Sequence, residues 1–114
     1  MTLRIDYVEF ESEALGESRA FFQSAFGWRF TDYGPDYLGI EDAGVDGGIS
    51  RAEGARKPPL VILYTDDIDA AESSVRGAGG VITREQFDFP GGRRFHFREP
   101  GGNELAVWSE GKAT

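Results

Sequence analysis

The sequence predicts an α+β fold in which one domain contains two similar βαβββ halves. Three observations support this prediction. The order of strand-like and helix-like segments repeats at an offset of roughly fifty residues. Each helix-like segment ends at glycine, and a Pro-Gly-Gly-Asn turn joins the last two strand-like segments. The length of 114 residues allows one domain, residues 1–114, and leaves little room for a second.

The first half, residues 4–51, begins with a strand over residues 4–10, where polar and apolar residues alternate. Leu15, Phe22 and Phe26 then fall on one helical face. We expect Phe22 and Phe26 to pack under the sheet. The helix is expected to end at Gly27. Three short strands should follow, over residues 28–31, 36–40 and 47–51.

The second half, residues 60–108, repeats this order after a charged, proline-containing linker over residues 52–59. Residues 60–64 form an apolar run typical of a strand. Asp66 and Asp67 offer oxygens that can cap a helix. The helical stripe that follows consists of Ile68, Ala71, Val75 and Ala78, and ends at Gly79 and Gly80. The remaining strands are expected over residues 80–84, 93–98 and 104–108.

Composition disfavours several classes of partner. The formal net charge is -8, so nucleic acid and anionic membrane surfaces would repel the chain, and Arg93 and Arg94 are too few to reverse this. The absence of Cys excludes disulfides and thiolate metal sites. The start Met-Thr-Leu-Arg-Ile-Asp lacks the apolar run of a signal peptide, and no run reaches transmembrane length. We therefore expect a cytoplasmic protein with no nucleic-acid or membrane partner.

Two motifs resemble those of a known family. Residues 21–28, Phe-Phe-Gln-Ser-Ala-Phe-Gly-Trp, resemble a Phe-Tyr-x-x-x-Phe-Gly-Trp helix end. Residues 99–103 resemble an Asp-Pro-x-Gly-Asn hairpin, with Glu99 in place of Asp. Together they resemble the glyoxalase, bleomycin-resistance and extradiol-dioxygenase group, the vicinal oxygen chelate superfamily. The resemblance covers nearly the whole chain and implies a curled mixed sheet around a concave cavity, with the helices outside.

The chain departs from the metal-binding members of that family. In those members a His on the first strand of each half and a Glu on each final strand surround a divalent ion. The matching positions here hold Tyr7, Leu60 and Ala106, and residues 46–51 have no carboxylate in their middle. Leu and Ala offer no lone pair, and His96 is the only histidine. We therefore predict no metal and no cofactor.

Strand alternation indicates which residues replace the metal on the concave face. Tyr7 and Glu9 share one side of the first strand, and Arg94 and His96 share one side of a later strand. Trp108 shares the side of Ala106. Resemblance to the related fosfomycin-modifying enzymes implies that Glu9, Arg94 and His96 point into the cavity. The predicted ligand-binding residues are Tyr7, Glu9, Arg94, His96 and Trp108.

Glu9 and His96 are also candidate catalytic residues, because a carboxylate and an imidazole can transfer protons near neutral pH. Each candidate site residue has a structural interpretation as well. Glu9 can be a solvated carboxylate, Arg94 part of a surface ion pair, and His96 a hydrogen-bonded structural residue. Tyr7 and Trp108 can be core residues. The glycine pairs at 47–48, 79–80, 91–92 and 101–102 are interpreted as turn and bulge formers, because none has P-loop context.

Three functional hypotheses remain. The first is a metal-free cavity that binds a small organic ligand, similar to bleomycin-resistance proteins. The alternative is a glyoxalase- or dioxygenase-like enzyme with lyase, isomerase or transferase chemistry, which uses Glu9 and His96 or a non-standard metal site. A third is a regulatory or interaction module with a closed cavity. Exposed sheet edges also predict a homodimer.

Overall fold

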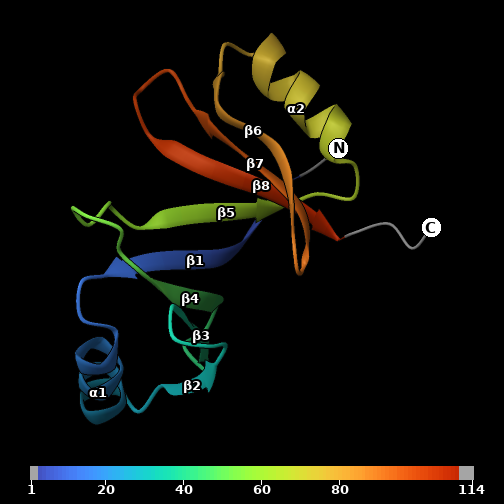
Figure 1. Ribbon diagram of the computed structural model, residues 1–114. Helices are drawn as coiled ribbons and strands as arrows, with labels where there is room; N and C mark the ends of the chain where they lie inside the picture. The colour runs from blue at the N-terminus through green and yellow to red at the C-terminus, as the bar shows by residue number, and fades with distance from the viewer. Residues whose placement is uncertain (1–2, 111–114) are drawn as a thin grey trace. The chain divides into compact units, whose positions relative to one another are not determined.

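The computed structural model describes residues 3–110. The chain divides into two compact units (Figure 1). The first module comprises residues 7–60. The second module comprises residues 3–6 and 61–110 of the described chain.

Four strands and one helix form the first module. They are β1 (Arg4–Ser12), α1 (Leu15–Phe26), β2 (Arg29–Asp32), β3 (Tyr37–Glu41) and β4 (Asp46–Arg51). From Tyr7 onward β1 runs parallel to β4, and β4 pairs antiparallel with β3, which pairs antiparallel with β2. The module is therefore a mixed sheet with a helix between its first and second strands.

The core of the first module lies between α1 and one face of this sheet. Its buried residues are Leu15, Leu38, Ile40 and Ile49, with Phe10, Phe22, Trp28 and Phe30 packed against them. The leucine and isoleucine positions in β3 alternate with outward-facing residues, as expected for a sheet covered on one side.

The α1 helix ends where the sequence predicted, but one of its aromatic residues does not lie where the sequence predicted. Gly27 adopts a left-handed conformation with φ of 72° and donates its N–H to Gln23. Phe22 packs on the core, whereas the prediction that Phe26 packs under the sheet is wrong, because 58% of Phe26 is exposed. Trp28 stacks on Phe22 with ring centroids 4.8 Å apart, and Phe26 lies against this pair. The space beside Phe22 is thus already filled by Trp28.

The second module repeats the same order of elements. They are β5 (Leu60–Tyr64), α2 (Ile68–Gly77), β6 (Val81–Phe89), β7 (Gly92–Arg98) and β8 (Glu104–Glu110). β5 runs parallel to β8, and β7 pairs antiparallel with both β8 and β6. The predicted α+β class and the two βαβββ modules are confirmed.

The α2 helix packs on one face of its sheet (Figure 1). Asp67 caps it by accepting a hydrogen bond from the Ala70 N–H. The helix ends at Gly77, so Ala78 caps the helix and does not extend its stripe. The buried core consists of Ala71, Phe95, Phe97 and Val107, with Leu3, Leu63, Val75, Ile82 and Leu105 packed against it.

The strand predicted over residues 80–84 is too short, because β6 extends to Phe89. Its pairing with β7 shifts register between Ile82 and Arg84 and again between Arg84 and Phe87. Such irregularities interrupt the period of two that identifies a strand in a sequence. The segment after Arg84 therefore does not alternate regularly, although it remains paired.

The hairpin between β7 and β8 is held by Glu99. Its carboxylate accepts hydrogen bonds from the backbone N–H groups of Gly101 and Asn103 and from the Asn103 side chain. These donors, with the Gly101 N–H the largest contributor, lower the pKa of Glu99. A glutamate can therefore fill the position where the family motif has aspartate.

Neither helix among the described residues is long and apolar enough to cross a lipid bilayer.

Candidate functional site

The helix-free face of the first module carries a polar chain of three side chains. Tyr7 and Glu9 extend from β1, and Tyr37 extends from β3. The Tyr37 hydroxyl donates to Glu9 Oε2 at 2.9 Å and forms a second hydrogen bond with the Tyr7 hydroxyl. Phe10 packs into the core, so Tyr7 and Glu9, which have the opposite parity in β1, belong to the uncovered face, as the alternation of β1 predicted.

Gly48 lies beneath these phenols. It pairs with Glu9 of β1 on one side and with Gly39 of β3 on the other. A Cβ atom at Gly48 would lie 2.6 Å from the Tyr7 hydroxyl oxygen and would overlap the ring and hydroxyl of Tyr37. The interpretation of Gly47 and Gly48 as turn and bulge formers is wrong, because both lie inside β4 and pair there without a register shift. Gly48 is needed because only a residue without a side chain leaves room for the two tyrosines.

Tyr37 was not identified from the sequence. Burial, the negative charge of Glu9 and the hydrogen bond with Tyr7 raise the pKa of Tyr37 far above its ordinary value. The phenol therefore remains a protonated donor at any physiological pH. Its position within the predicted strand over residues 36–40, opposite in parity to Leu38 and Ile40, is the one sequence signal that could have placed it on this face.

The helix-free face of the second module carries Arg94, His96 and Trp108. Phe95 and Phe97 of β7 are buried against α2, so Arg94 and His96 lie on the other face. Arg94 pairs with Trp108 of β8 in the strand register. Sequence alternation predicted this grouping.

Arg94 and His96 form a hydrogen-bonded pair with a fixed direction. Arg94 Nε and Nη2 lie 3.2 and 3.0 Å from His96 Nε2. A guanidinium has only donors, so Nε2 accepts and the ring proton is on Nδ1. Nδ1 lies 3.9 Å from Glu104 Oε2. In this arrangement His96 orients the Arg94 guanidinium.

Aromatic rings surround Arg94. The guanidinium carbon lies 5.7 Å from the ring centroid of Phe87 and 5.8 Å from that of Phe89. Phe89 also contacts Trp108, with centroids 6.1 Å apart, and Tyr64 contacts Trp108 from β5 at 5.0 Å. The sequence prediction missed Phe87 and Phe89 because it ended this strand at residue 84, and both residues follow the two register shifts of β6. Their alternation in Phe-Asp-Phe was the available signal.

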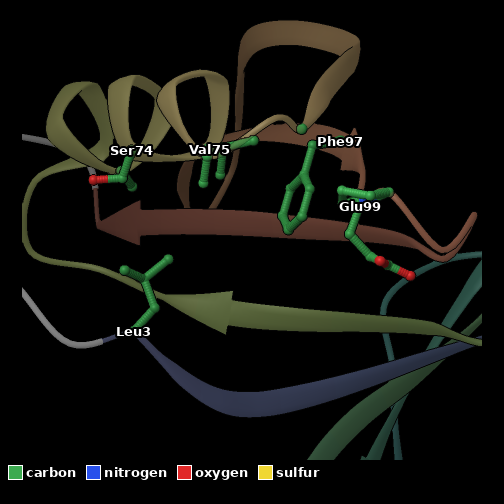
Figure 2. Close-up of a pocket in the computed structure, with 9 residues that line it drawn as sticks. Leu3, Ser74, Val75, Phe97 and Glu99 are labelled. Carbon is green, nitrogen blue, oxygen red and sulfur yellow. The ribbon is translucent and has the colours of Figure 1, made fainter.

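A separate apolar groove of about 240 Å³ lies on the helix-covered side of the second module. Figure 2 shows Val75 of α2 and Phe97 of β7 in this groove, with Leu3 and Glu99 near its ends. Glu99 is the one titratable residue in its lining, and the hairpin already engages that carboxylate. Apart from Glu99 and the Ser74 hydroxyl, the side chains that line the groove are apolar.

The described residues thus bring together two sets of predicted site residues. Tyr7 and Glu9 meet through Tyr37 in the first module, and Arg94, His96 and Trp108 share a face in the second. That both sets line one cavity remains a prediction.

In a comparison with protein families, residues 4–107 match the Glyoxalase/Bleomycin resistance protein/Dioxygenase superfamily. The chain is a member of this superfamily. A search of curated proteins gives no significant match.

Solved structures of other members share the fold. The Mn(II)-bound glyoxalase from Novosphingobium aromaticivorans is 23% identical, with a TM-score of 0.71 over 96% of this chain and 40% of the glyoxalase. A superfamily member from Vibrio splendidus is 18% identical, with a TM-score of 0.73 over 96% of this chain and 100% of that protein. Methylmalonyl-CoA epimerase from Mycobacterium tuberculosis is 13% identical, with a TM-score of 0.73 over 95% and 88% of the two chains.

The residues of this superfamily member do not fit the metal site of the metal-binding members. Ala106 in β8 is fully buried and has only a methyl side chain. Leu60 at the start of β5 likewise has no side-chain atom that can bind a metal ion. Gly48, in the middle of β4, has no side chain at all. Within residues 3–110, no group of three or more His, Asp or Glu side chains is arranged to hold a metal ion. The residues at these positions therefore provide no ligand set for a divalent ion.

Proposed function

We propose that this superfamily member binds a small organic ligand that bears an anionic or carbonyl group, without a metal ion. Arg94 is the proposed anchor, together with Trp108. The observation that carries the proposal is the fixed orientation of Arg94 by His96 and by the rings of Phe87 and Phe89.

A guanidinium held in this way suits an acceptor ligand. Its planar set of N–H donors matches a carboxylate or carbonyl oxygen, and its charge persists near neutral pH. The surrounding rings provide apolar contact area for a planar ligand body. An aromatic carboxylate combines both features and is a suitable probe.

An enzymatic function has less support. The Nε2 lone pair of His96 already accepts N–H groups of Arg94, which favours a positioning role over proton transfer. Glu9 accepts a hydrogen bond from the Tyr37 hydroxyl, which favours a positioning role for Glu9 over a catalytic one. Leu60 and Ala106 likewise support the absence of metal chemistry, because they cannot act as ligands.

Residues of the first module are part of the same proposal. We propose that Tyr7 and Glu9 also contact the ligand, as the resemblance to fosfomycin-modifying enzymes implies. The protein is proposed to act as a homodimer, because large apolar side chains such as Phe21, Phe26 and Val81 are more than half exposed in the single chain.

The test is a titration with benzoate, followed by residue-resolved amide NMR. Benzoate should shift the signals around Arg94 and Trp108, and Arg94→Ala should weaken its binding by about 1 to 3 kcal/mol. Arg93→Ala is the matched control, since Arg93 is adjacent but bonds to Gln86 and Asp88. Equal losses in the two variants would refute the assignment. Metal analysis that finds about one tightly held ion per chain would refute the metal-free state.

A further inference from the structure

The polar chain of the first module has a fixed direction, because its three groups hold only two protons. Tyr37 donates its single O–H to Glu9, and an ionised carboxylate can only accept. The hydrogen bond between the phenols must therefore use the proton of Tyr7. Donation runs from Tyr7 to Tyr37 and from Tyr37 to Glu9.

This direction decides what can join the chain. The Tyr7 and Glu9 oxygens have lone pairs, but both hydroxyl protons of the polar chain are already used in the hydrogen bonds between its members. Any additional partner of either oxygen, from the protein or from a ligand, must therefore be a hydrogen-bond donor. An acceptor such as an ether oxygen would leave these oxygens facing another lone pair.

The arrangement is built into the strands. Gly48 lets the two phenols lie over the β4 backbone, where a Cβ atom would displace them. Burial and the charge of Glu9 keep Tyr37 protonated, so its donation to the carboxylate persists. Tyr37 thus imposes the direction, although Tyr7 and Glu9 are the two ends of the chain.

We infer that the helix-free face of the first module is a subsite for a hydrogen-bond-donating group of a small ligand, a hydroxyl or an amine. Tyr37 acts as the specificity-determining residue, since it accepts the single proton of Tyr7 and donates its own to Glu9, so that both ends of the polar chain can only accept. This inference rests on the proposed function, that the protein binds a small organic ligand.

The test compares benzyl alcohol with benzyl methyl ether, which differ in the donor proton. In amide NMR titrations of the full chain, benzyl alcohol should shift the signals of Glu9 and Gly48. It should bind about five-fold more tightly than the ether, as expected for one hydrogen bond. Equal binding of the two probes, or no shift in the first module with either, would overturn the inference.

Variants test the role of Tyr37. In Tyr37→Phe the Tyr7 proton can point outward to an ether oxygen, whereas Glu9 can still only accept, so the preference for the alcohol should fall without vanishing. Tyr33→Phe is the matched control, because Tyr33 is 66% exposed yet contacts the Tyr37 ring, and it should keep the preference. A preference that is unchanged in Tyr37→Phe would overturn the role of Tyr37.

A second variant tests the inference even if Tyr37→Phe does not fold. Glu9→Gln offers an amide N–H to a ligand, so it should also reduce the preference for the alcohol, and an unchanged preference would contradict the inference. Benzoate separates the two proposals. Shifts around Arg94 with benzoate, without first-module shifts from either benzyl probe, would refute this inference alone. No shift with any probe would refute the proposed function too.

Discussion

The indole Nε1 of Trp108 donates to the carboxylate of Asp6 at 3.1 Å and joins the two ends of the second module. Asp6 comes from the start of β1 and Trp108 from β8, 102 positions later in the sequence. Trp108 also contacts the rings of Phe89 and Tyr64, so the hydrogen bond to Asp6 orients an indole that lies between these two rings.

Asp6→Ala should lower the free energy of unfolding by about 1 kcal/mol, because the half-buried indole N–H loses its acceptor. Urea denaturation measures the change. In a Trp108→Phe background the same Asp6→Ala substitution should cost little, since no indole donor remains. Equal losses in both backgrounds would show that the hydrogen bond does not contribute.

Gly48→Ala should destabilise the protein by about 2 kcal/mol, because its methyl group would overlap Tyr37 and approach Tyr7. Thermal and urea unfolding measure the loss. Gly16→Ala is the matched control: Gly16 lies in α1, and a Cβ atom there would meet nothing within 4 Å, so alanine should be neutral or stabilising. Removal of the hydroxyl in a Gly48→Ala, Tyr37→Phe double variant should recover part of the loss, and complete additivity would contradict the proposed overlap.

Glu99→Gln should weaken the β7–β8 hairpin above pH 5 and have less effect in acid. The pKa of Glu99 is lowered below its ordinary value of 4.5 in the folded protein. A carboxylate of this kind contributes stability that is fully present above its unfolded-state pKa and is lost as pH falls through its folded-state pKa. The difference in Tm between wild type and Glu99→Gln should therefore shrink as pH falls below about 4.5.

Glu53→Gln, in the exposed linker, is the control for this pH series. Its Tm should follow that of the wild type throughout. A Glu99→Gln difference that stays constant down to the acid limit would mean that the carboxylate charge does not stabilise the hairpin.

Sedimentation equilibrium should show a homodimer at micromolar concentration. Phe21 and Phe26 are each 58% exposed, and Val81 is 56% exposed, so the single chain leaves substantial apolar surface in water. Phe21→Ser and Val81→Ser should be compared, because one lies on α1 and the other on the edge strand β6. A monomeric wild type would refute the prediction.

The sequence by itself determined the α+β class, the two βαβββ modules and several details within single elements. Gly27 ends α1 because its left-handed conformation suits a residue without Cβ, and Asp67 caps α2 through its own side chain. The alternation of Phe95 and Phe97 with Arg94 and His96 predicted the two faces of β7 correctly. All these features depend on residues a few positions apart.

Only the tertiary structure decided which side chains meet across strands. Tyr37 reaches Glu9, 28 positions away, because β1 and β3 both pair with β4 around Gly48. Phe87 reaches Arg94 because β6 shifts register twice before that pair. Strand pairing and bulges set these contacts, and a local period of two cannot reveal them, because it fixes the face of a strand but neither its neighbour nor its register.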